Sequence, residues 1–330
     1  MVRMVSLALK VTALTCAVSC AWGPAVPQSA AAAGISAAKA ASPARAALLR
    51  IAAGSDMQAV PAPLESFAGS VVRELSTQSE FQQWDGATIV YYPLGPGTHS
   101  WLAIVARDGK QLGYLIFTAR EEGGYMLSEY GGGPAIPYSS DALHDRLAED
   151  GLIPDQPGLP ANVQIQAQYS AMLPVWKVTL PGKPAMHINA LTLELLPANA
   201  VSSSTSTAAR TAVVTNQNGL RLEASSTVAK KGGGDPYDDL LWMTSPRLNI
   251  RRGDDLLKAV ASGGSLIFTA PGRNASYGAP FAVSGVHTWS PAASAPAVSY
   301  AATGRAGTRY LPVSMLMAAG EFHARPRASS

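Results

Sequence analysis

The stretch that decides the fold is Trp101-Leu-Ala-Ile-Val-Ala-Arg-Asp-Gly-Lys-Gln-Leu-Gly-Tyr-Leu-Ile-Phe-Thr118. Two runs of large apolar residues lie on either side of Asp108-Gly109, and an Asp-Gly pair in that position is a strong signal for a two-residue hairpin turn. Similar short runs lie at 88–92 and 125–130, and the turn residues at 93–97 and 121–124 separate them from this hairpin. The sequence therefore predicts an antiparallel meander of four strands.

Helices and further strands are predicted around this meander. Apolar residues three and four positions apart predict a helix over 64–77 that packs on one face of the meander. Short helices are also predicted at 139–150, from Asp254 to about 260, and at 313–318. Further strands are predicted at 163–169, 173–180, 185–190, 265–270, 281–289 and 298–302. The fold class is therefore α+β, with antiparallel sheets, few short helices and two or three small domains.

Composition divides the chain into successive regions. We expect a signal peptide over 1–33, a flexible Ala/Ser/Pro tether over 34–62 and an α+β region over 63–197. A linker over 198–234 is rich in Ser, Thr and Gly, which cannot bury enough apolar surface to order itself. Within that linker, 211–222 offers an alternative, a hairpin around Asn218-Gly219. A β-rich region over 235–324 and a tail over 325–330 complete the chain.

The N-terminus predicts export. Arg3 and Lys10 precede an apolar run over 11–22, and small residues follow at 29–33, the pattern of a secretory signal peptide cleaved near Ala33. An ordinary N-terminal helix and a lipoprotein anchored at Cys20 are the alternatives. No later stretch reaches the ~20 apolar residues of a membrane helix. We therefore predict a secreted mature chain without a membrane span.

Charge and cysteine content exclude several classes of protein. Charged residues are 14% of the chain, and the two cysteines, Cys16 and Cys20, both precede the predicted cleavage site. A mature chain without cysteine has no disulfide scaffold, no thiolate zinc site and no cysteine nucleophile. Residues 34–197 carry 10 basic and 15 acidic groups, and 198–330 carry 13 and 7, so docking of the two halves and a chance imbalance are both open. The basic residues are scattered, and we expect no nucleic-acid binding.

Motifs for metal and cofactor binding are missing from the sequence. No two of the five histidines have the spacing of neighbours on a helix, and there is neither a Gly-x-Gly-x-x-Gly motif nor a phosphate-binding loop. We therefore predict no metal site and no cofactor. The adjacent carboxylates at 121–122, 238–239 and 254–255 fit turns and helix starts better than a glycosidase pair.

Two sets of residues remain as site candidates. Ser284 and His287 bring a hydroxyl and an imidazole close in sequence, but an offset of three on a strand puts them on opposite faces unless Gly285 turns the chain. They are the catalytic candidates. Tyr277, His287 and Trp289 are the binding candidates, since aromatic side chains on strands form binding faces for sugars and peptides. The alternative is that these aromatic rings fill the core.

Two segments resemble propeptide modules. Gly113-Tyr-Leu-Ile-Phe-Thr-Ala119 and Gly124-Tyr-Met-Leu-Ser-Glu-Tyr-Gly131 resemble the hairpin of propeptides of secreted, streptopain-type cysteine peptidases. Val175-Trp-Lys-Val-Thr-Leu180 and the run from Met186 to Pro197 look like the end of a PepSY module. Asn189 stands where that pattern has Asp, and Leu193 where it has Gly. The resemblance implies a β-hairpin region able to occupy a peptidase cleft.

The C-terminal region resembles the second half of C39-like, papain-fold peptidases. The similar segments are Asp255-Leu-Leu-Lys-Ala-Val260, Ser265-Leu-Ile-Phe268, Ala279-Pro-Phe-Ala-Val-Ser-Gly285, Val298-Ser-Tyr-Ala-Ala302 and Tyr310-Leu-Pro-Val-Ser-Met-Leu316, the last matching the final helix. The family's histidine falls on Ala279 or Pro280, and its acidic or amide partner on 301–302. The catalytic cysteine, histidine and acid are therefore all absent, and the resemblance implies a relative in fold without peptidase activity.

These observations predict a secreted, non-catalytic protein that is peptidase-derived or propeptide-like and binds a protein, a peptide or a cell-wall component. Inhibition of an extracellular peptidase is the sharper form of this hypothesis. The alternatives are a hydrolase with a site around Ser284 and His287, and a purely structural surface protein.

Overall fold

The computed structural model describes residues 59–95, 99–133, 136–156, 158–170, 172–198, 200–201, 212–216, 220–222, 235–263, 266–291, 296–304 and 309–325. The predicted signal peptide, with Cys16 and Cys20, and nearly all of the tether lie outside these residues. So do most of the linker over 198–234 and the tail after residue 325.

The described chain contains groups of consecutive strands with helices between them. The helices are α2 (Ala62–Leu75), η1 (Ser79–Trp84), α3 (Ser140–Glu149), η4 (Leu240–Thr244), α4 (Gly253–Gly263), α5 (Asn274–Tyr277) and α6 (Val313–Ala319). The first seven strands are β1 (Thr88–Leu94), β2 (Ser100–Arg107), β3 (Lys110–Ala119), β4 (Tyr125–Gly132), β5 (Gln164–Ser170), β6 (Leu173–Thr179) and β7 (Met186–Asn189). The others are β8 (Val214–Thr215), β9 (Leu220–Leu222), β10 (Leu266–Thr269), β11 (Phe281–Pro291), β12 (Val298–Thr303), β13 (Arg309–Pro312) and β14 (Glu321–Ala324).

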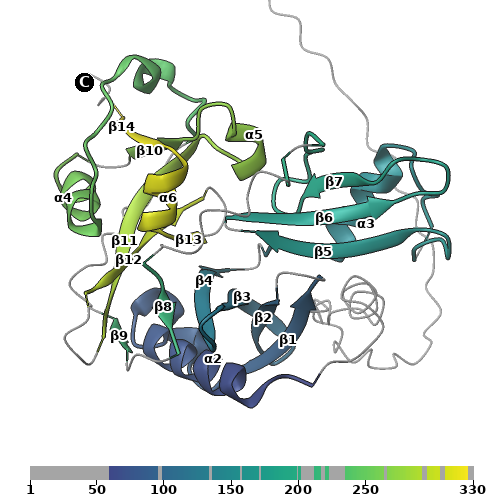
Figure 1. Ribbon diagram of the computed structural model, residues 1–330, viewed down its shortest axis with the longest axis horizontal. Helices are drawn as coiled ribbons and strands as arrows, with labels where there is room; N and C mark the ends of the chain where they lie inside the picture. Colours follow the sequence, from purple (N-terminus) through teal and green to yellow (C-terminus); the bar gives the residue numbers. More distant parts are fainter. Residues whose placement is uncertain are drawn as a thin grey trace, which may run out of the picture. The chain divides into compact units, whose positions relative to one another are not determined.

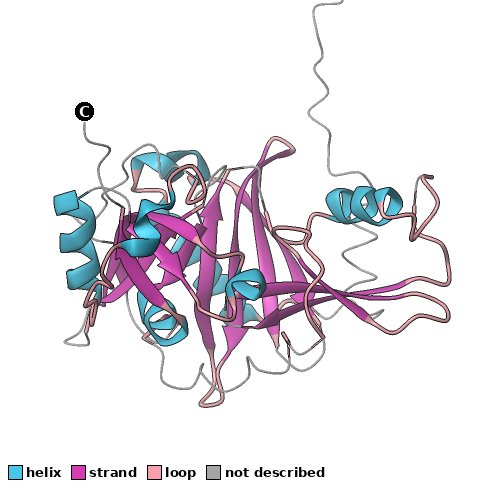
Figure 2. Cartoon of the chain, turned by 90° about the horizontal axis from the view of Figure 1, so that it is seen from above, coloured by secondary structure: helices cyan, strands magenta, loops and turns pink. Residues whose placement is uncertain are grey.

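Two antiparallel sheets contain the strands of the described residues. The larger has 11 strands in the order β1-β2-β3-β4-β13-β12-β11-β10-β14, with β8 paired to β4 and β9 paired to β11. The smaller has the order β5-β6-β7. Figure 1 labels the strands of both sheets, and Figure 2 shows strands standing side by side with helices beside them. The predicted α+β class and the four-stranded meander β1–β4 are confirmed.

Local sequence signals explain the central hairpin. Asp108 has φ 52° and Gly109 has φ 72°, and this pair of positive φ values is the backbone of the turn that suits the twist of two antiparallel strands. Along β3, Leu115 and Phe117 point to one face of the sheet, while Tyr114 and Ile116 point to the other, as the two-residue period of a strand requires.

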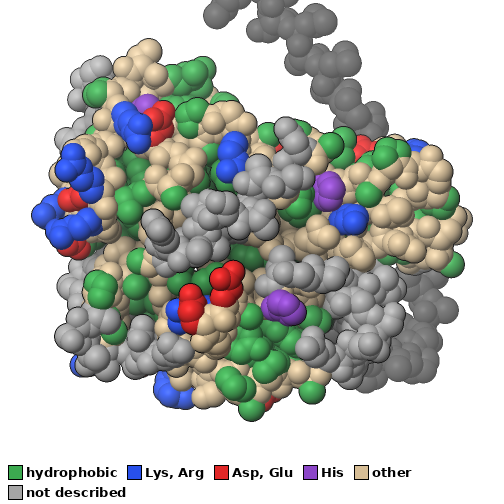
Figure 3. All heavy atoms as spheres, viewed as in Figure 1, with side chains coloured by type: hydrophobic (Ala, Val, Ile, Leu, Met, Phe, Trp, Pro, Cys, Tyr) green, Lys and Arg blue, Asp and Glu red, His purple; other side chains and the backbone are tan. Residues whose placement is uncertain are grey.

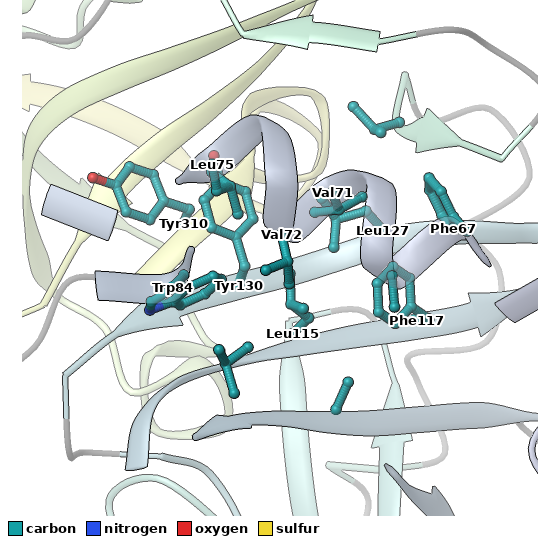
Figure 4. Packing of buried hydrophobic residues seen from close by; sticks show 14 of the residues in the cluster. Phe67, Val71, Val72, Leu75, Trp84, Leu115, Phe117, Leu127, Tyr130 and Tyr310 are labelled. Carbon is teal, nitrogen blue, oxygen red and sulfur yellow. The ribbon is translucent and has the colours of Figure 1, made fainter. Parts of the chain in front are cut away.

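Three main cores hold the unit together. The first lies between α2 and the larger sheet, where the buried residues of α2 (Leu64, Phe67, Ala68, Val71, Val72 and Leu75) face Leu115 and Phe117 (Figure 4). The second fills the space between the opposite face of the meander, α3 and the smaller sheet. The third joins α4 and α6 to the C-terminal strands. Both faces of the meander are therefore covered.

The two predicted regions, 63–197 and 235–324, share the larger sheet. Strand β4 of the first pairs with β13 of the second, and Tyr130 lies opposite Tyr310. The acidic and basic halves of the chain are therefore joined by a strand pair, and the described residues of both halves belong to one compact unit.

Several short elements differ from the expectation. Strands β8 and β9 form within the predicted linker and pair with β4 and β11, while the predicted turn residues Asn218-Gly219 lie outside the described residues. Residues 309–312 form the strand β13, which was not predicted, whereas the helix predicted over 313–318 is confirmed as α6, which begins at Val313. Because β13 has four residues and includes a proline, its own sequence carries little strand signal.

Candidate binding cavity

One cavity of about 460 Å³ lies where several distant segments meet. That volume lies within the range of about 300–1,000 Å³ typical of ligand pockets. Residues from β3, the turn after β7, the start of the region over 235–324, the α5–β11 junction and the β12–β13 connection line it. They are Tyr114, Leu191, Thr192, Glu194, Asp235, Pro236, Tyr237, Tyr277, Gly278, Ala279, Pro280, Phe281, Ala282, Thr303, Gly304 and Arg309.

Aromatic side chains give the cavity its apolar character. Tyr277 and Phe281 flank the α5–β11 junction, where Gly278 has φ 64° and ends α5 in a left-handed conformation. The guanidinium carbon of Arg273 lies 4.7 Å from the centre of the Tyr277 ring. Burial raises the pKa of Tyr277 and Arg273 opposes that rise, but the pKa stays above its usual value. Tyr277 is therefore an uncharged aromatic surface at neutral pH.

A buried ion pair joins the cavity to the sheet. Arg309 donates from Nε to Glu129 Oε1 at 3.0 Å and from Nη2 to Glu129 Oε2 at 2.6 Å, and Nη2 also donates to the Met172 carbonyl at 2.9 Å. The Tyr114 and Tyr169 hydroxyls donate to the same carboxylate at 3.0 and 2.9 Å. Glu129 is completely buried, so its charge depends on these four donors.

The ion pair keeps Arg309 charged beside the cavity. Burial opposes the charge of Arg309, but the carboxylate of Glu129 raises the pKa of the guanidinium above its usual value. A guanidinium has five N–H donors. The hydrogen bonds of Arg309 to described residues use Nε and Nη2, and the same side chain is one of those that line the cavity.

The predicted binding residues separate in the structure. Tyr277 lines the cavity, whereas His287 and Trp289 are completely buried on β11, in or beside the core under α2. The sequence had left open whether the aromatic rings bind a ligand or fill the core. The structure places one of the three residues at the cavity and two in the interior.

The predicted catalytic residues lie on the same strand. Ser284 is the extra residue of a β-bulge in β11, between Val283 and Gly285. The His287 ring makes its contacts elsewhere: Nδ1 is 2.9 Å from the Tyr130 hydroxyl, and Nε2 is 2.7 Å from Glu80 Oε1. The second contact is short, but it lies off the axis of a well-aligned hydrogen bond. Among the described hydrogen bonds and ion pairs, none joins His287 to Ser284.

His287 belongs instead to a buried network of aromatic residues. Its ring stacks on Tyr310 with 4.1 Å between centroids, and Tyr310 stacks on Tyr130 at 4.7 Å. Trp289 Nε1 donates to the Tyr130 hydroxyl at 3.3 Å, and the Tyr310 hydroxyl donates to Glu80. The network connects η1 to β4, β11 and β13, and so holds distant segments together.

The stability of the protein at acidic pH should depend on Glu80. Its side chain is 27% exposed, and its backbone is more exposed. Burial alone would raise the pKa of Glu80, but the contacts with His287 and Tyr310 lower it below its usual value. A carboxyl whose pKa is lowered by folding stabilises the protein fully above its unfolded pKa, and this contribution disappears as the pH falls through the folded pKa.

We therefore expect Glu80→Gln to flatten the loss of stability between about pH 5 and pH 3. Urea unfolding at a series of pH values would measure how the free energy of unfolding of each protein changes with pH. Glu121→Gln, at an exposed turn position, is the matched control. Its stability should fall with decreasing pH as steeply as that of the unchanged protein. A Glu80→Gln variant with the original slope would contradict the assignment.

The remaining charge features behave as capping or surface groups. The Asp255 carboxylate accepts hydrogen bonds from the backbone N–H groups of Arg251 and Arg252 at 3.0 and 3.1 Å, which supports the predicted capping role at the start of α4. Figure 3 shows Lys and Arg side chains gathered at the left, over the part of the view where Figure 1 places α4.

The described residues contain no group of three His, Cys, Asp or Glu side chains suited to a metal ion. None of their helices has the length and hydropathy needed to cross a membrane.

Sequence reasoning missed most of the cavity. Arg309, Glu129 and the turn after β7 carry no recognisable motif. One signal was present: Asn189, at the position where the PepSY pattern has Asp, accepts hydrogen bonds from the N–H groups of Leu191 and Thr192 at 2.9 and 3.2 Å. That turn shapes one wall of the cavity.

Searches against protein-family models, curated proteins and solved structures found no match to this chain.

Proposed function

We propose that this chain is an exported, non-catalytic binding protein that takes a peptide segment into the cavity beside Tyr277. The observation that supports this proposal is the composition of the lining, which has aromatic and aliphatic walls and the charged side chain of Arg309. An apolar pocket with a few placed polar groups suits a ligand that has both an apolar side chain and a hydrogen-bond acceptor. A peptide unit combines the two.

The absence of catalytic residues at the positions that the papain-fold resemblance assigns to them supports binding without catalysis. Ala279 and Pro280, which the papain-fold resemblance equates with the catalytic histidine, both line the cavity. Acyl transfer needs a nucleophile and a base within hydrogen-bond reach of each other. The described lining contains no Ser, Cys, His or Lys. The lining does hold one hydroxyl beside a carboxylate, Thr192 Oγ1 donating to Glu194 Oε2 at 3.3 Å, but both residues lie on an exposed turn, and the proposed ligand is held and released unchanged.

Blocked dipeptides test the cavity directly. We expect acetyl-Ala-Leu-amide and acetyl-Ala-Phe-amide to bind saturably in calorimetry, and acetyl-Ala-Ser-amide to bind about tenfold more weakly, since the serine side chain buries less apolar surface. Tyr277→Ala should weaken the Leu and Phe probes by about tenfold, whereas Tyr277→Phe, which keeps the ring, should stay within about twofold.

The matched control is Tyr91→Ala, which removes a half-buried tyrosine from β1, outside the cavity. It should bind all three dipeptides like the unchanged protein. A thermal melt of each variant separates lost binding from lost folding. Equal affinity for the Leu and Ser probes, or an unchanged affinity in a folded Tyr277→Ala protein, would refute the proposed cavity function.

Inhibition of an extracellular peptidase is the sharper form of this proposal. Its test uses the chain from residue 34 as bait for the culture supernatant of the producing organism, followed by a protein-hydrolysis assay of that supernatant. Capture of a secreted peptidase together with loss of its activity would support inhibition. If no peptidase is captured and hydrolysis is unchanged, the inhibitor form is wrong, and the dipeptide experiment still decides the cavity.

A further inference from the structure

An apolar platform lies beside the cavity, formed by Tyr237, Leu240, Leu241 and Met243. These residues are 65, 53, 59 and 62% exposed. These four account for most of the large hydrophobic side chains exposed in the described ranges, and the other two, Val90 and Leu195, belong to separate parts of the chain. Single exposed apolar residues are ordinary, but a cluster of this kind marks an interaction surface.

The platform is held in a fixed conformation. Trp242, in its middle, is 7% exposed, and its Nε1 donates to the Pro236 carbonyl at 2.8 Å. Asp239 caps η4 by accepting the Leu241 N–H at 2.9 Å, and the Ser245 hydroxyl donates to the Ala324 carbonyl at 2.9 Å. A 3₁₀-helix has three residues per turn, so Leu240 and Met243 share one face. Since Trp242 points inward, its neighbours are directed outward.

Charge indicates which partner the platform fits. Asp235, Asp238 and Asp239 are interleaved with the apolar residues, and 235–245 contains no Lys or Arg. Among the described cations, Arg325 donates to the Asp235 backbone carbonyl and Arg247 pairs with Glu321 at 3.2 Å. Carboxylates around an apolar surface favour a partner that presents basic groups around its own apolar residues. They disfavour an anionic lipid surface.

The platform is continuous with the cavity. Asp235, Pro236 and Tyr237 line the cavity, and Tyr237 belongs to both surfaces. A segment lying on Leu240 and Met243, which share one face of η4, can therefore extend past Tyr237 toward Tyr277.

We propose that the apolar platform docks a basic, apolar segment of a partner protein whose neighbouring residue enters the cavity. This inference rests on the proposed function for the identity of the second contact. The platform itself stands on the exposure and fixed conformation of its four side chains.

Three short labelled peptides test the platform by fluorescence anisotropy: alternating Leu and Lys, alternating Leu and Glu, and alternating Ser and Lys. We expect the Leu/Lys peptide to bind at least about tenfold more tightly than the other two. The double variant Leu240→Ser/Leu241→Ser should lose about tenfold in affinity for that peptide. The matched control, Val90→Ser/Leu195→Ser, removes the two exposed apolar residues outside the platform and should stay within about twofold.

The charge of the platform has its own variant. Asp238→Asn leaves the helix cap at Asp239 intact. It should lower the affinity for the Leu/Lys peptide and reduce the difference in affinity between the Leu/Lys and Leu/Glu peptides. Equal binding of the Leu/Lys and Leu/Glu peptides, or unchanged Leu/Lys binding in the folded double variant, would overturn the inference.

Two further measurements identify other occupants. Binding to phosphatidylcholine vesicles, with or without phosphatidylglycerol, that the double variant loses would assign the platform to lipid and overturn a protein partner. Concentration-dependent dimerisation that the double variant loses would assign it to a second copy of the chain, with the same consequence.

The experiments distinguish failure of the cavity proposal from failure of the platform proposal. If the double variant still binds the blocked dipeptides, only the platform has been altered. If the unchanged protein binds the Leu/Lys peptide through the platform but binds no dipeptide, the proposed cavity function is wrong and the docking surface remains.

Discussion

Replacing Glu129 with alanine is expected to lower the free energy of unfolding by about 3–5 kcal/mol. The carboxylate is completely buried, and Arg309, Tyr114 and Tyr169 all donate to it. Without it, the guanidinium of Arg309 stays in the interior with its charge uncompensated, and two buried hydroxyls lose their acceptor. Breaking one side of a buried ion pair costs far more than the intact pair contributes, because the remaining charge is desolvated and unpaired. Urea unfolding at neutral pH measures the loss.

A surface ion pair provides the control for that experiment. Arg120 Nη2 lies 3.1 Å from Glu122 Oε2, and the Glu122 side chain is 68% exposed. Glu122→Ala should change the free energy of unfolding by at most about 1 kcal/mol, since water and salt screen such pairs. A Glu129→Ala protein no less stable than Glu122→Ala would show that the buried charge of Arg309 finds other compensation. The same variant should also lose dipeptide binding, because Glu129 orients the guanidinium that lines the cavity.

Local signals were sufficient where a segment's partner is its neighbour in sequence. The Asp108-Gly109 turn joins strands that pair with each other, and the three- and four-residue spacing along α2 describes one apolar face that packs on the nearest sheet. Strand β13 shows the limit of such signals. It has four residues, and its partner β4 lies about 180 positions earlier, as the Glu129–Arg309 contacts do. No period within residues 309–312 could indicate that pairing.

The candidate site was predictable in part for the same reason. The interest in Tyr277 came from its aromatic side chain, and the structure places it in the cavity wall. His287 and Trp289 have equally suggestive side chains, but β11 is a central strand of the larger sheet, and its position there buries both. The polar partner in the cavity, Arg309, is an ordinary residue in a segment without a motif. Its role comes from Glu129, on the other side of the predicted domain boundary.

Trp84 shows how strongly such long-range contacts should affect stability. Its side chain is 1% exposed, it packs edge-on against Phe81 with 4.7 Å between ring centroids, and its indole N–H donates to the Leu112 carbonyl at 3.4 Å. The ring also explains Gly113 on β3. A Cβ at that position would lie 2.4 Å from the Trp84 ring and 2.3 Å from the Gly131 carbonyl. The glycine allows the sheet to approach the indole closely.

We expect Trp84→Ala to lower the free energy of unfolding by about 3–5 kcal/mol, because it empties a fully buried site that two rigid elements border. Trp84→Phe should retain most of the packing and lose less than half as much. Native-state proteolysis should then cut first within η1, since the Trp84 ring joins this element to β3. If Trp84→Ala were as stable as Trp84→Phe, the space would have collapsed, and η1 would be held mainly by the contacts of Glu80 with His287 and Tyr310. Combining Trp84→Ala with Glu80→Gln would separate these two attachments, because additive losses would mean that each holds η1 independently.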